Sequence, residues 1–80
     1  MKLLIFVTED TAADATVDAL VEQGFRVTRL ASTGGFLRRG NTTLLVGVDD
    51  AAVERAAAVV RAAAPGALMI TLNLERYERV

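Results

Sequence analysis

The stretch FRVTRLASTGGFLRRGNTTLLVGVDD, residues 25–50, decides the fold of this 80-residue chain. Residues 25–31 alternate between apolar and polar side chains, which is typical of a strand with one polar face. Residues 42–48 are rich in threonine, leucine and valine and predict another strand. The stretch therefore predicts two consecutive strands joined by a polar, glycine-bearing loop at residues 32–41.

The residues before this stretch predict a strand and then a helix. Residues 2–7 form a continuous apolar run of strand length, as in a strand that is buried on both faces. Thr11 stands three residues before Asp14, which is the spacing of a helix start, and apolar residues follow at helical spacing. Gly24 stands where a glycine would cap the end of that helix.

The residues after this stretch predict a second helix and a last strand. Asp49 or Asp50 is expected to cap the helix, and Pro65 stops it because proline cannot continue the hydrogen-bond ladder. Residues 67–74 then predict a strand whose alternate leucine and isoleucine side chains face the core, with Met69 on the opposite face.

The predicted order of elements is β-α-β-β-α-β, which is the ferredoxin-like pattern. We expect a single α+β domain over residues 1–80, in which both helices cover one face of a four-stranded antiparallel sheet. The other face would carry apolar side chains of the first strand together with Leu45 and Met69. Because hydrophobic residues make up 52% of so short a chain, we expect a partner subunit to cover this face.

The composition argues against several classes of function. The net charge is −1 with no concentrated basic face, which argues against a nucleic-acid partner. The chain holds no histidine and no cysteine, so an imidazole base, a disulfide and the usual zinc sites are excluded. The apolar run at the N-terminus is too short for a signal peptide or a membrane span, so we expect a cytoplasmic protein without membrane insertion.

The acidic residues do not favour an enzyme. The pairs Glu9-Asp10 and Asp49-Asp50 stand at predicted helix starts, where carboxylates cap the helix rather than catalyse or bind a metal. A ferredoxin-like acyl-phosphate hydrolase would need an arginine after the first strand, where this chain has TEDT. An RNA-binding version of the fold would need exposed aromatic residues on its central strands, and this sequence, with three phenylalanines and one tyrosine, is not expected to provide them. We therefore expect no catalytic residues and no metal site.

The loop between the two central strands is the strongest candidate for a binding site. Its glycines allow positive φ and a close approach of backbone amides to an anion. Arg38 suits a phosphate, and the apolar tip of Phe36 and Leu37 suits a base or a subunit contact. Arg26 and Thr28 share one face of the preceding strand and stand just ahead of the loop. A loop that only reinforces a subunit interface stays open as the alternative.

The motif TGGFLRRGNTT, residues 33–43, closely resembles the signature of the PII-like cyclic di-AMP receptors (PstA/DarA type). The resemblance begins at Met1, runs through the second predicted helix and resumes in the last strand. Members of this family are homotrimers of ferredoxin-like subunits that bind cyclic di-AMP in clefts between neighbouring subunits. They signal through a mobile loop rather than by catalysis. The resemblance therefore implies a PII-like signal transduction protein whose ligand is cyclic di-AMP and which needs no cofactor.

The resemblance also implies which residues bind the ligand. Asn41 would hydrogen-bond a base, residues 35–37 would lie against an adenine, and Gly47 would leave room for the ligand. Arg26 and Thr28 would contact the ligand from the second strand. With Arg38 for a phosphate, the expected ligand-binding residues are Arg26, Thr28, Gly35, Phe36, Leu37, Arg38, Asn41 and Gly47.

The chain departs from this family near its C-terminus. Members carry a long excursion between the second helix and the last strand, whereas here Pro65 and Gly66 lead directly into the strand. Ile70 and Arg79 stand where the family has an aromatic residue and a glutamine that contribute to the ligand site.

Two functions are therefore carried forward. The first is a non-enzymatic signalling protein that binds a nucleotide, above all cyclic di-AMP, between the subunits of a homotrimer and acts on a downstream protein. The second is an oligomeric PII-like interaction module that has lost ligand binding or binds a different nucleotide. They differ in whether the shortened C-terminal part still completes the ligand site.

Overall fold

The elements of the fold follow the order predicted from the sequence. The computed structural model describes residues 1–30, 40–76 and 78–80. Its strands and helices are β1 (Lys2–Glu9), α1 (Asp10–Glu22), β2 (Val27–Leu30), β3 (Asn41–Val48), α2 (Val53–Ala63) and β4 (Leu68–Asn73). A short 3-10 turn, Asp50–Ala52, precedes α2. Within the described residues, no helix has the length and hydrophobicity that would be needed to cross a membrane.

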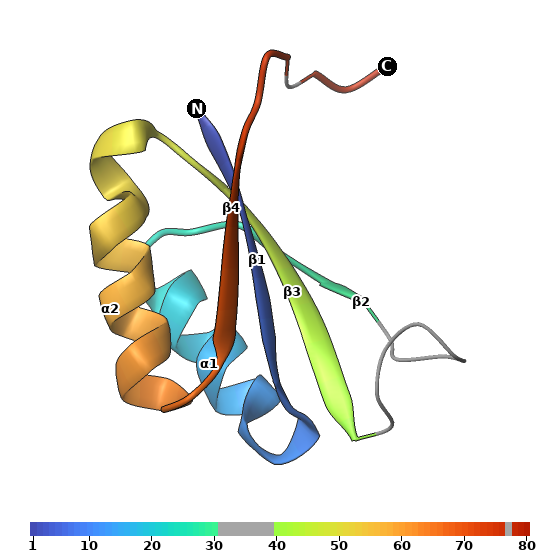
Figure 1. The fold of residues 1–80 in the computed structure, drawn as a ribbon, viewed down its shortest axis with the longest axis vertical. Coiled ribbons are helices and arrows are strands. Elements are labelled where there is room, and N and C mark those ends of the chain that lie inside the picture. The colour runs from blue at the N-terminus through green and yellow to red at the C-terminus, as the bar shows by residue number, and fades with distance from the viewer. Residues whose placement is uncertain (31–39, 77) are drawn as a thin grey trace.

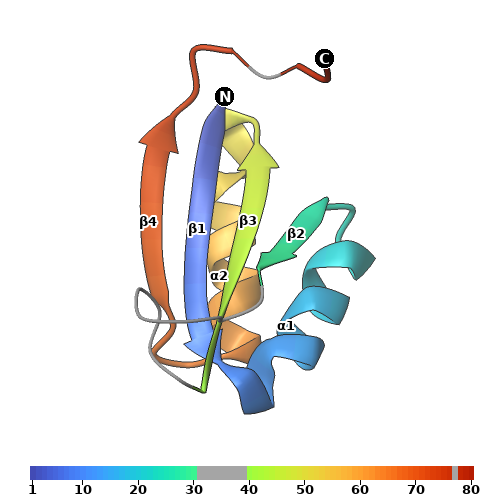
Figure 2. The same cartoon turned by 90° about the vertical axis from the view of Figure 1, so that its right-hand side faces the viewer.

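The strands form one antiparallel sheet in the order β2-β3-β1-β4, which is the order of a ferredoxin-like fold. β1 lies inside the sheet, and its Leu4 pairs with Val46 of β3 on one side and with Thr71 of β4 on the other. Figure 2 shows the strands side by side with both helices behind them, and Figure 1 shows the helix layer from the side. The predicted α+β architecture, with both helices on one face of a four-stranded sheet, is confirmed.

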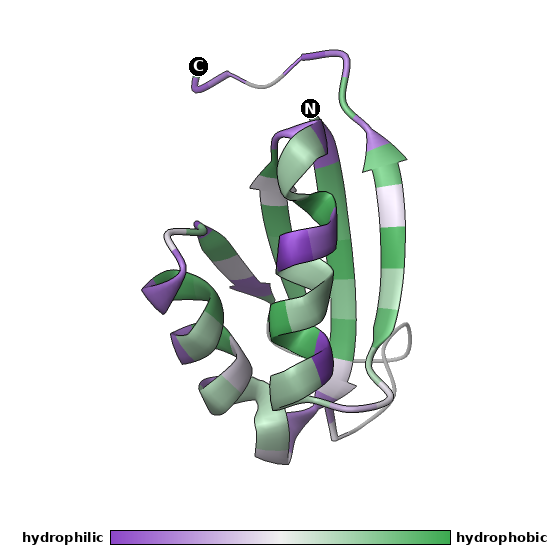
Figure 3. Ribbon diagram, turned by 90° about the vertical axis from the view of Figure 1, so that its left-hand side faces the viewer, coloured by the Kyte–Doolittle hydropathy of each residue, from purple (hydrophilic) through white to green (hydrophobic). Residues whose placement is uncertain are grey.

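The core lies between the sheet and the helix layer. Its largest members from the strands are Leu4, Phe6, Leu44 and Val46, whose side chains are at most 1% exposed. Leu20 of α1 and small residues of α2 pack against them. In Figure 3 the hydrophobic strands lie behind the helices, and the helices show hydrophilic bands toward the viewer. Because side chains alternate along a strand, this burial fixes which residues point away from the helices.

The starts of the helices differ from the prediction, whereas the glycine stop after α1 is confirmed. α1 begins at Asp10, earlier than predicted, and its N-cap residue Glu9 makes no side-chain capping hydrogen bond. Asp49 precedes the 3-10 turn without a capping bond, and α2 begins only at Val53. The prediction that these carboxylates cap the helices through side-chain hydrogen bonds was therefore wrong. Gly24 follows α1 with a φ of +90°, the left-handed conformation of a glycine at a helix end.

The face of the sheet that points away from the helices carries a group of apolar residues, which we call the apolar face. Its members are Leu3, Ile5 and Val7 of β1, Leu45 of β3 and Leu68, Ile70 and Leu72 of β4. Leu68, Ile70 and Leu72 are 57%, 41% and 46% exposed. These residues form a continuous apolar surface over β1 and β4, because the β4 residues pair directly with those of β1.

Met69 lies on the opposite face from the one predicted. β4 pairs Met69 with Phe6, whose side chain is 1% exposed in the core. Because side chains of directly paired residues leave the sheet on the same face, Met69 points toward the helix layer. The prediction was wrong because both residue sets of β4 contain apolar side chains, and only the pairing register decides which set faces the core.

Candidate functional site

Half of the eight predicted ligand-binding residues lie in described parts of the chain. The described residues are Arg26, Thr28, Asn41 and Gly47. Gly35, Phe36, Leu37 and Arg38 lie outside the described residues. The site is therefore built from the two strands that flank the loop.

The four described residues share the β2–β3 half of the open sheet face. Thr28 pairs with Leu45, so both side chains leave the sheet on the face opposite the helices. Asn41 and Gly47 stand an even number of residues from Leu45, and since side chains alternate along β3, they belong to the same face. Arg26 directly precedes β2, two residues before Thr28. We call Arg26, Thr28, Asn41 and Gly47 the β2–β3 strip.

Asn41 and Gly47 stand at opposite ends of this strip. Asn41 pairs with Glu9, where β1 ends, and Gly47 pairs with Leu3, where β1 begins. The six residue steps between them span about 20 Å at about 3.4 Å per step. The structure therefore brings Arg26 to the Gly47 end and leaves Asn41 at the far end, so a ligand that touches all four residues must extend along the strands.

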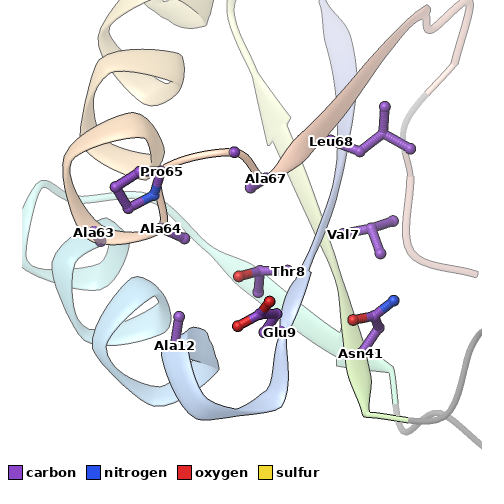
Figure 4. Close-up of a pocket in the computed structure, with 11 residues that line it drawn as sticks. Val7, Thr8, Glu9, Ala12, Asn41, Ala63, Ala64, Pro65, Ala67 and Leu68 are labelled. Atoms are coloured by element: carbon purple, nitrogen blue, oxygen red, sulfur yellow. The ribbon is translucent and has the colours of Figure 1, made fainter.

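A cavity of about 660 Å³ opens at the Asn41 end of the sheet. It lies between the ends of β1 and α2 and the starts of β3 and β4, and Figure 4 shows the side chains that line it. Most of its lining is apolar or small, including Val7, Pro65 and Leu68, whereas Asn41 and Glu9 contribute an amide and a carboxylate. Apolar walls with a few polar groups are the usual lining of a site for an organic ligand such as a base.

A second cavity, of about 410 Å³, opens at the Gly47 end, and its lining includes Arg26 and Arg55 of α2. Arg55 is held in place by two contacts. Its guanidinium lies 4.5 Å from the centre of the Phe25 ring, and its Nη1 donates a hydrogen bond of 2.9 Å to the carbonyl oxygen of Gln23. Two guanidinium groups beside one cavity suit a phosphate-bearing ligand, because arginine forms charge-assisted hydrogen bonds to phosphate oxygens.

The charged groups around this second cavity leave it with a net positive charge. The N-terminal ammonium of Met1, which lines the cavity, lies 3.1 Å from Oδ1 of Asp50. Its hydrogen bond, together with the positive charge of Lys2, holds the pKa of the Asp50 carboxyl below its ordinary value of 3.8. Asp50 lies next to the lining, and Asp49 is the carboxylate within it. The two arginines and the ammonium thus face two carboxylates, a balance that favours an anionic ligand.

Asp10 holds the start of β3 from the first turn of α1. Its backbone N–H donates a hydrogen bond of 2.8 Å to the carbonyl oxygen of Gly40, and its carboxylate accepts a hydrogen bond from the hydroxyl of Thr42. Thr42 is buried, and Asn41 lies between the two anchored residues. Sequence reasoning assigned Asp10 to helix capping and missed this contact, because no local pattern indicates a partner 32 residues away.

Two comparisons with known proteins bear on the family of the chain. A crystal structure of a functionally unknown protein from Pediococcus pentosaceus ATCC 25745 matches the fold with a TM-score of 0.85 and 28% sequence identity. That match covers 99% of this chain and 96% of that chain, so it extends over nearly the whole length of both. The model of the cyclic-di-AMP receptor family matches residues 1–79. In agreement with the resemblance of its loop motif, the chain belongs to the cyclic-di-AMP receptor family.

Proposed function

We propose that this chain is a non-enzymatic signalling protein that binds cyclic di-AMP in clefts between the subunits of a cytoplasmic homotrimer. Membership of the cyclic-di-AMP receptor family supports the class of ligand. Because the protein would act by binding rather than by a reaction, its signal would pass to a downstream protein that distinguishes the liganded form from the free form.

The observation that carries this proposal is the division of the open sheet face into two halves. The β2–β3 half holds the strip of predicted ligand contacts, whereas the β1–β4 half holds all of the apolar face except Leu45, which lies on β3. An exposed apolar surface of this kind favours contact with another subunit. The β2–β3 strip lies beside that surface, so a neighbouring subunit seated there would enclose a ligand bound along the strip.

The chemistry of the two ends of the strip fits a cyclic dinucleotide. Cyclic di-AMP carries adenines and phosphates in one molecule, so it can present an anionic group to one end and a base to the other. Arg26, with Arg55 nearby, would meet a phosphate at the positive cavity. The side-chain amide of Asn41 can donate to and accept from an adenine at the other cavity.

The shortened C-terminal part would supply an aliphatic contact in place of ring stacking. Ile70, which stands where the resemblance puts an aromatic residue, belongs to the apolar face and is 41% exposed. An isoleucine can pack on the flat side of an adenine but adds no ring stacking, so we expect weaker binding than in a receptor that has the ring. Arg79 is exposed and would offer a charge to a phosphate where the family has an amide.

A second candidate function is a PII-like interaction module that binds no ligand or a different nucleotide. Its support is the apolar face itself, because Leu68, Ile70 and Leu72 would be buried in an oligomer whether or not a ligand is present. The two candidates differ at the β2–β3 strip, because the interaction module would not bind cyclic di-AMP there.

Calorimetric titration of the purified protein with cyclic di-AMP tests the proposal, with cyclic di-GMP, ATP and AMP as comparison ligands. We expect saturable binding of cyclic di-AMP and weaker or no binding of the other three. Light scattering should give a mass three times that of the 8.5 kDa chain. A trimer that binds none of the four nucleotides would favour the interaction module, and a monomer would contradict both candidates.

A further inference from the structure

We propose that Asp10 and Thr42 are positioning residues for Asn41, so that recognition of the base depends on a side-chain hydrogen bond between α1 and β3. The inference rests on the proposed function, because it takes Asn41 as a ligand contact. It adds to that function a pair of residues that would act without touching the ligand themselves.

Asn41 has few restraints from the sheet. It is the first residue of β3, and its cross-strand partner Glu9 is the last residue of β1. Within residues 1–30 and 40–76, the pairing between β2 and β3 reaches as far as Thr43, two residues away. Gly40, directly before Asn41, has a φ of +91°, a left-handed conformation that allows the chain to turn sharply at this point. The orientation of Asn41 therefore depends on whatever holds the residues on either side of it.

Besides the ladder pairing of β1 with β3, Asp10 supplies two hydrogen bonds that flank Asn41. Its backbone N–H donates to the carbonyl of Gly40 at 2.8 Å, and its carboxylate accepts from the hydroxyl of Thr42. Asp10 is also the first residue of α1 and directly follows Glu9, the cross-strand partner of Asn41. One short segment at the junction of β1 and α1 thus holds the start of β3 in place.

The hydrogen bond of Thr42 acts from the face of β3 opposite to the ligand strip. Thr42 is 5% exposed and belongs to the residue set that faces the helices. Asn41, one residue before it, faces the other way along the alternating strand and lines the cavity of about 660 Å³. The bond can therefore fix the backbone of Asn41 while its amide stays available to a base.

The part-buried hydrogen bond between Thr42 and Asp10 also stabilises the fold, so the test must separate positioning from stability. Thr16 of α1 offers a matched control. It is fully buried, and its hydroxyl donates a hydrogen bond of 2.7 Å to the carbonyl oxygen of Ala12. Thr16→Val removes a buried threonine hydroxyl within α1, as Thr42→Val does in β3, but leaves the segment around Asn41 intact.

The affinity for cyclic di-AMP, measured by calorimetry, tests the inference in two pairs of variants. Thr42→Val and Asp10→Ala remove the bond, and we expect the Kd to rise about tenfold in both. Thr42→Ser keeps the hydroxyl and Asp10→Asn keeps an acceptor oxygen, so these variants and Thr16→Val should stay within about twofold of the wild-type Kd. Because Asp10→Ala and Asp10→Asn both lose the charge, their difference isolates the hydrogen bond.

A second measurement uses the unliganded protein. In Thr42→Val, the Asp10 amide, which is bonded to Gly40, should exchange its hydrogen faster, and the side-chain amide resonance of Asn41 should shift. Thr16→Val should leave both signals unchanged. This comparison reports on the position of Asn41 without reference to affinity.

The inference is overturned if Thr42→Val binds cyclic di-AMP as tightly as the wild type, or if Thr16→Val loses as much affinity as Thr42→Val. A wild type that binds, together with an Asn41→Ala variant that does not, keeps the proposed function intact in either case. If the wild type binds no cyclic di-AMP, the proposed function is wrong, and the inference, which rests on it, is wrong as well.

Discussion

The guanidinium of Arg55 lies 4.5 Å from the centre of the Phe25 ring, and this contact joins α2 to the chain just before β2. Phe25 is 8% exposed, and Arg55 also bonds to the carbonyl of Gln23, two residues earlier. One guanidinium thus covers an aromatic ring, while the residue also lines the cavity at the Gly47 end.

Replacement of Arg55 should weaken the fold. We expect Arg55→Ala to lower the free energy of unfolding by about 1 kcal/mol, because the cation–π contact, the hydrogen bond to Gln23 and the packing of the stem are all lost. Urea denaturation measures this change. Arg61→Ala, at an exposed position of the same helix, serves as the control, and an equal loss there would show that the Phe25 contact contributes nothing specific.

Two adjacent threonines of β3 should respond oppositely to the same substitution. Thr42 and Thr43 are both 5% exposed, but the Thr43 hydroxyl has no hydrogen-bond partner among residues 1–30, 40–76 and 78–80. Thr42→Val should destabilise the protein by about 1 kcal/mol because it loses the hydrogen bond to the Asp10 carboxylate, whereas Thr43→Val should be neutral or stabilising. Thermal unfolding of both variants checks this, and an equal loss in Thr43→Val would mean that its hydroxyl is bonded in solution.

Arg26, which directly precedes β2, and Arg29, which lies within it, should differ in their effect on ligand binding. Arg26 lines the cavity at the Gly47 end, whereas Arg29 pairs with Leu44 on the helix side and lies 2.5 Å from the carboxylate of Asp14. Arg26→Ala should raise the Kd for cyclic di-AMP by at least about tenfold, because a charge-assisted contact to phosphate is lost. Arg29→Ala should bind as the wild type does. Similar losses in both variants would point to general electrostatic attraction instead of a site.

A charge on the apolar face should prevent assembly. Ile70 points away from the helices, and its neighbour Thr71 pairs with the core residue Leu4 on the other face but is itself exposed. Ile70→Lys should convert the proposed trimer to monomers because a buried, unpaired ammonium is costly, and Thr71→Lys should leave the mass unchanged. Light scattering compares the two variants. A trimer of Ile70→Lys would place the subunit contact on a different surface.

The ion pair between the N-terminus and Asp50 should give the protein a component of stability that is lost in acid. The pKa of this carboxyl is below its ordinary value of 3.8, so the pair stabilises the fold above that pH and is lost as the pH falls through the lower, folded-state pKa. The difference in Tm between wild type and Asp50→Asn should be constant from pH 6 to about pH 5 and should shrink as the pH falls below 3.8. Asp49→Asn controls for the change in net charge. A difference that stays the same as the pH falls would have another cause than this ion pair.

The sequence predicted the elements and their order because the signals for them are local. The apolar run before Thr8 and the left-handed Gly24 after α1 each depend on neighbouring residues alone. Met69 was assigned to the wrong face because the more apolar set of β4, with Ile70, was expected to face the core, whereas the pairing with β1 turns Met69 and Thr71 toward the helices.

The candidate site could be predicted only in part. Arg26 and Thr28 were expected on one face because alternation along a strand is local, and the pairing of Thr28 with Leu45 places that face away from the helices. The bond between Asp10 and Thr42 joins residues that meet only through the sheet, so no spacing in the sequence indicates it. Arg55 was missed for the same reason, since its place beside the cavity follows from the packing of α2 on the segment before β2.

Because of the position of β4, the stability of the protein should depend on its concentration. Within the part of the chain that the structure describes, this strand lies at the edge of the sheet and pairs with β1 alone. Its leucine and isoleucine side chains stay about half exposed in the single chain. Much of the hydrophobic stabilisation of β4 would therefore come from association, so by mass action the Tm should rise with protein concentration. A cell that makes few copies would hold subunits with a frayed last strand and no completed clefts. On the proposed function, the level of expression would thus determine how much cyclic di-AMP the protein in a cell can bind.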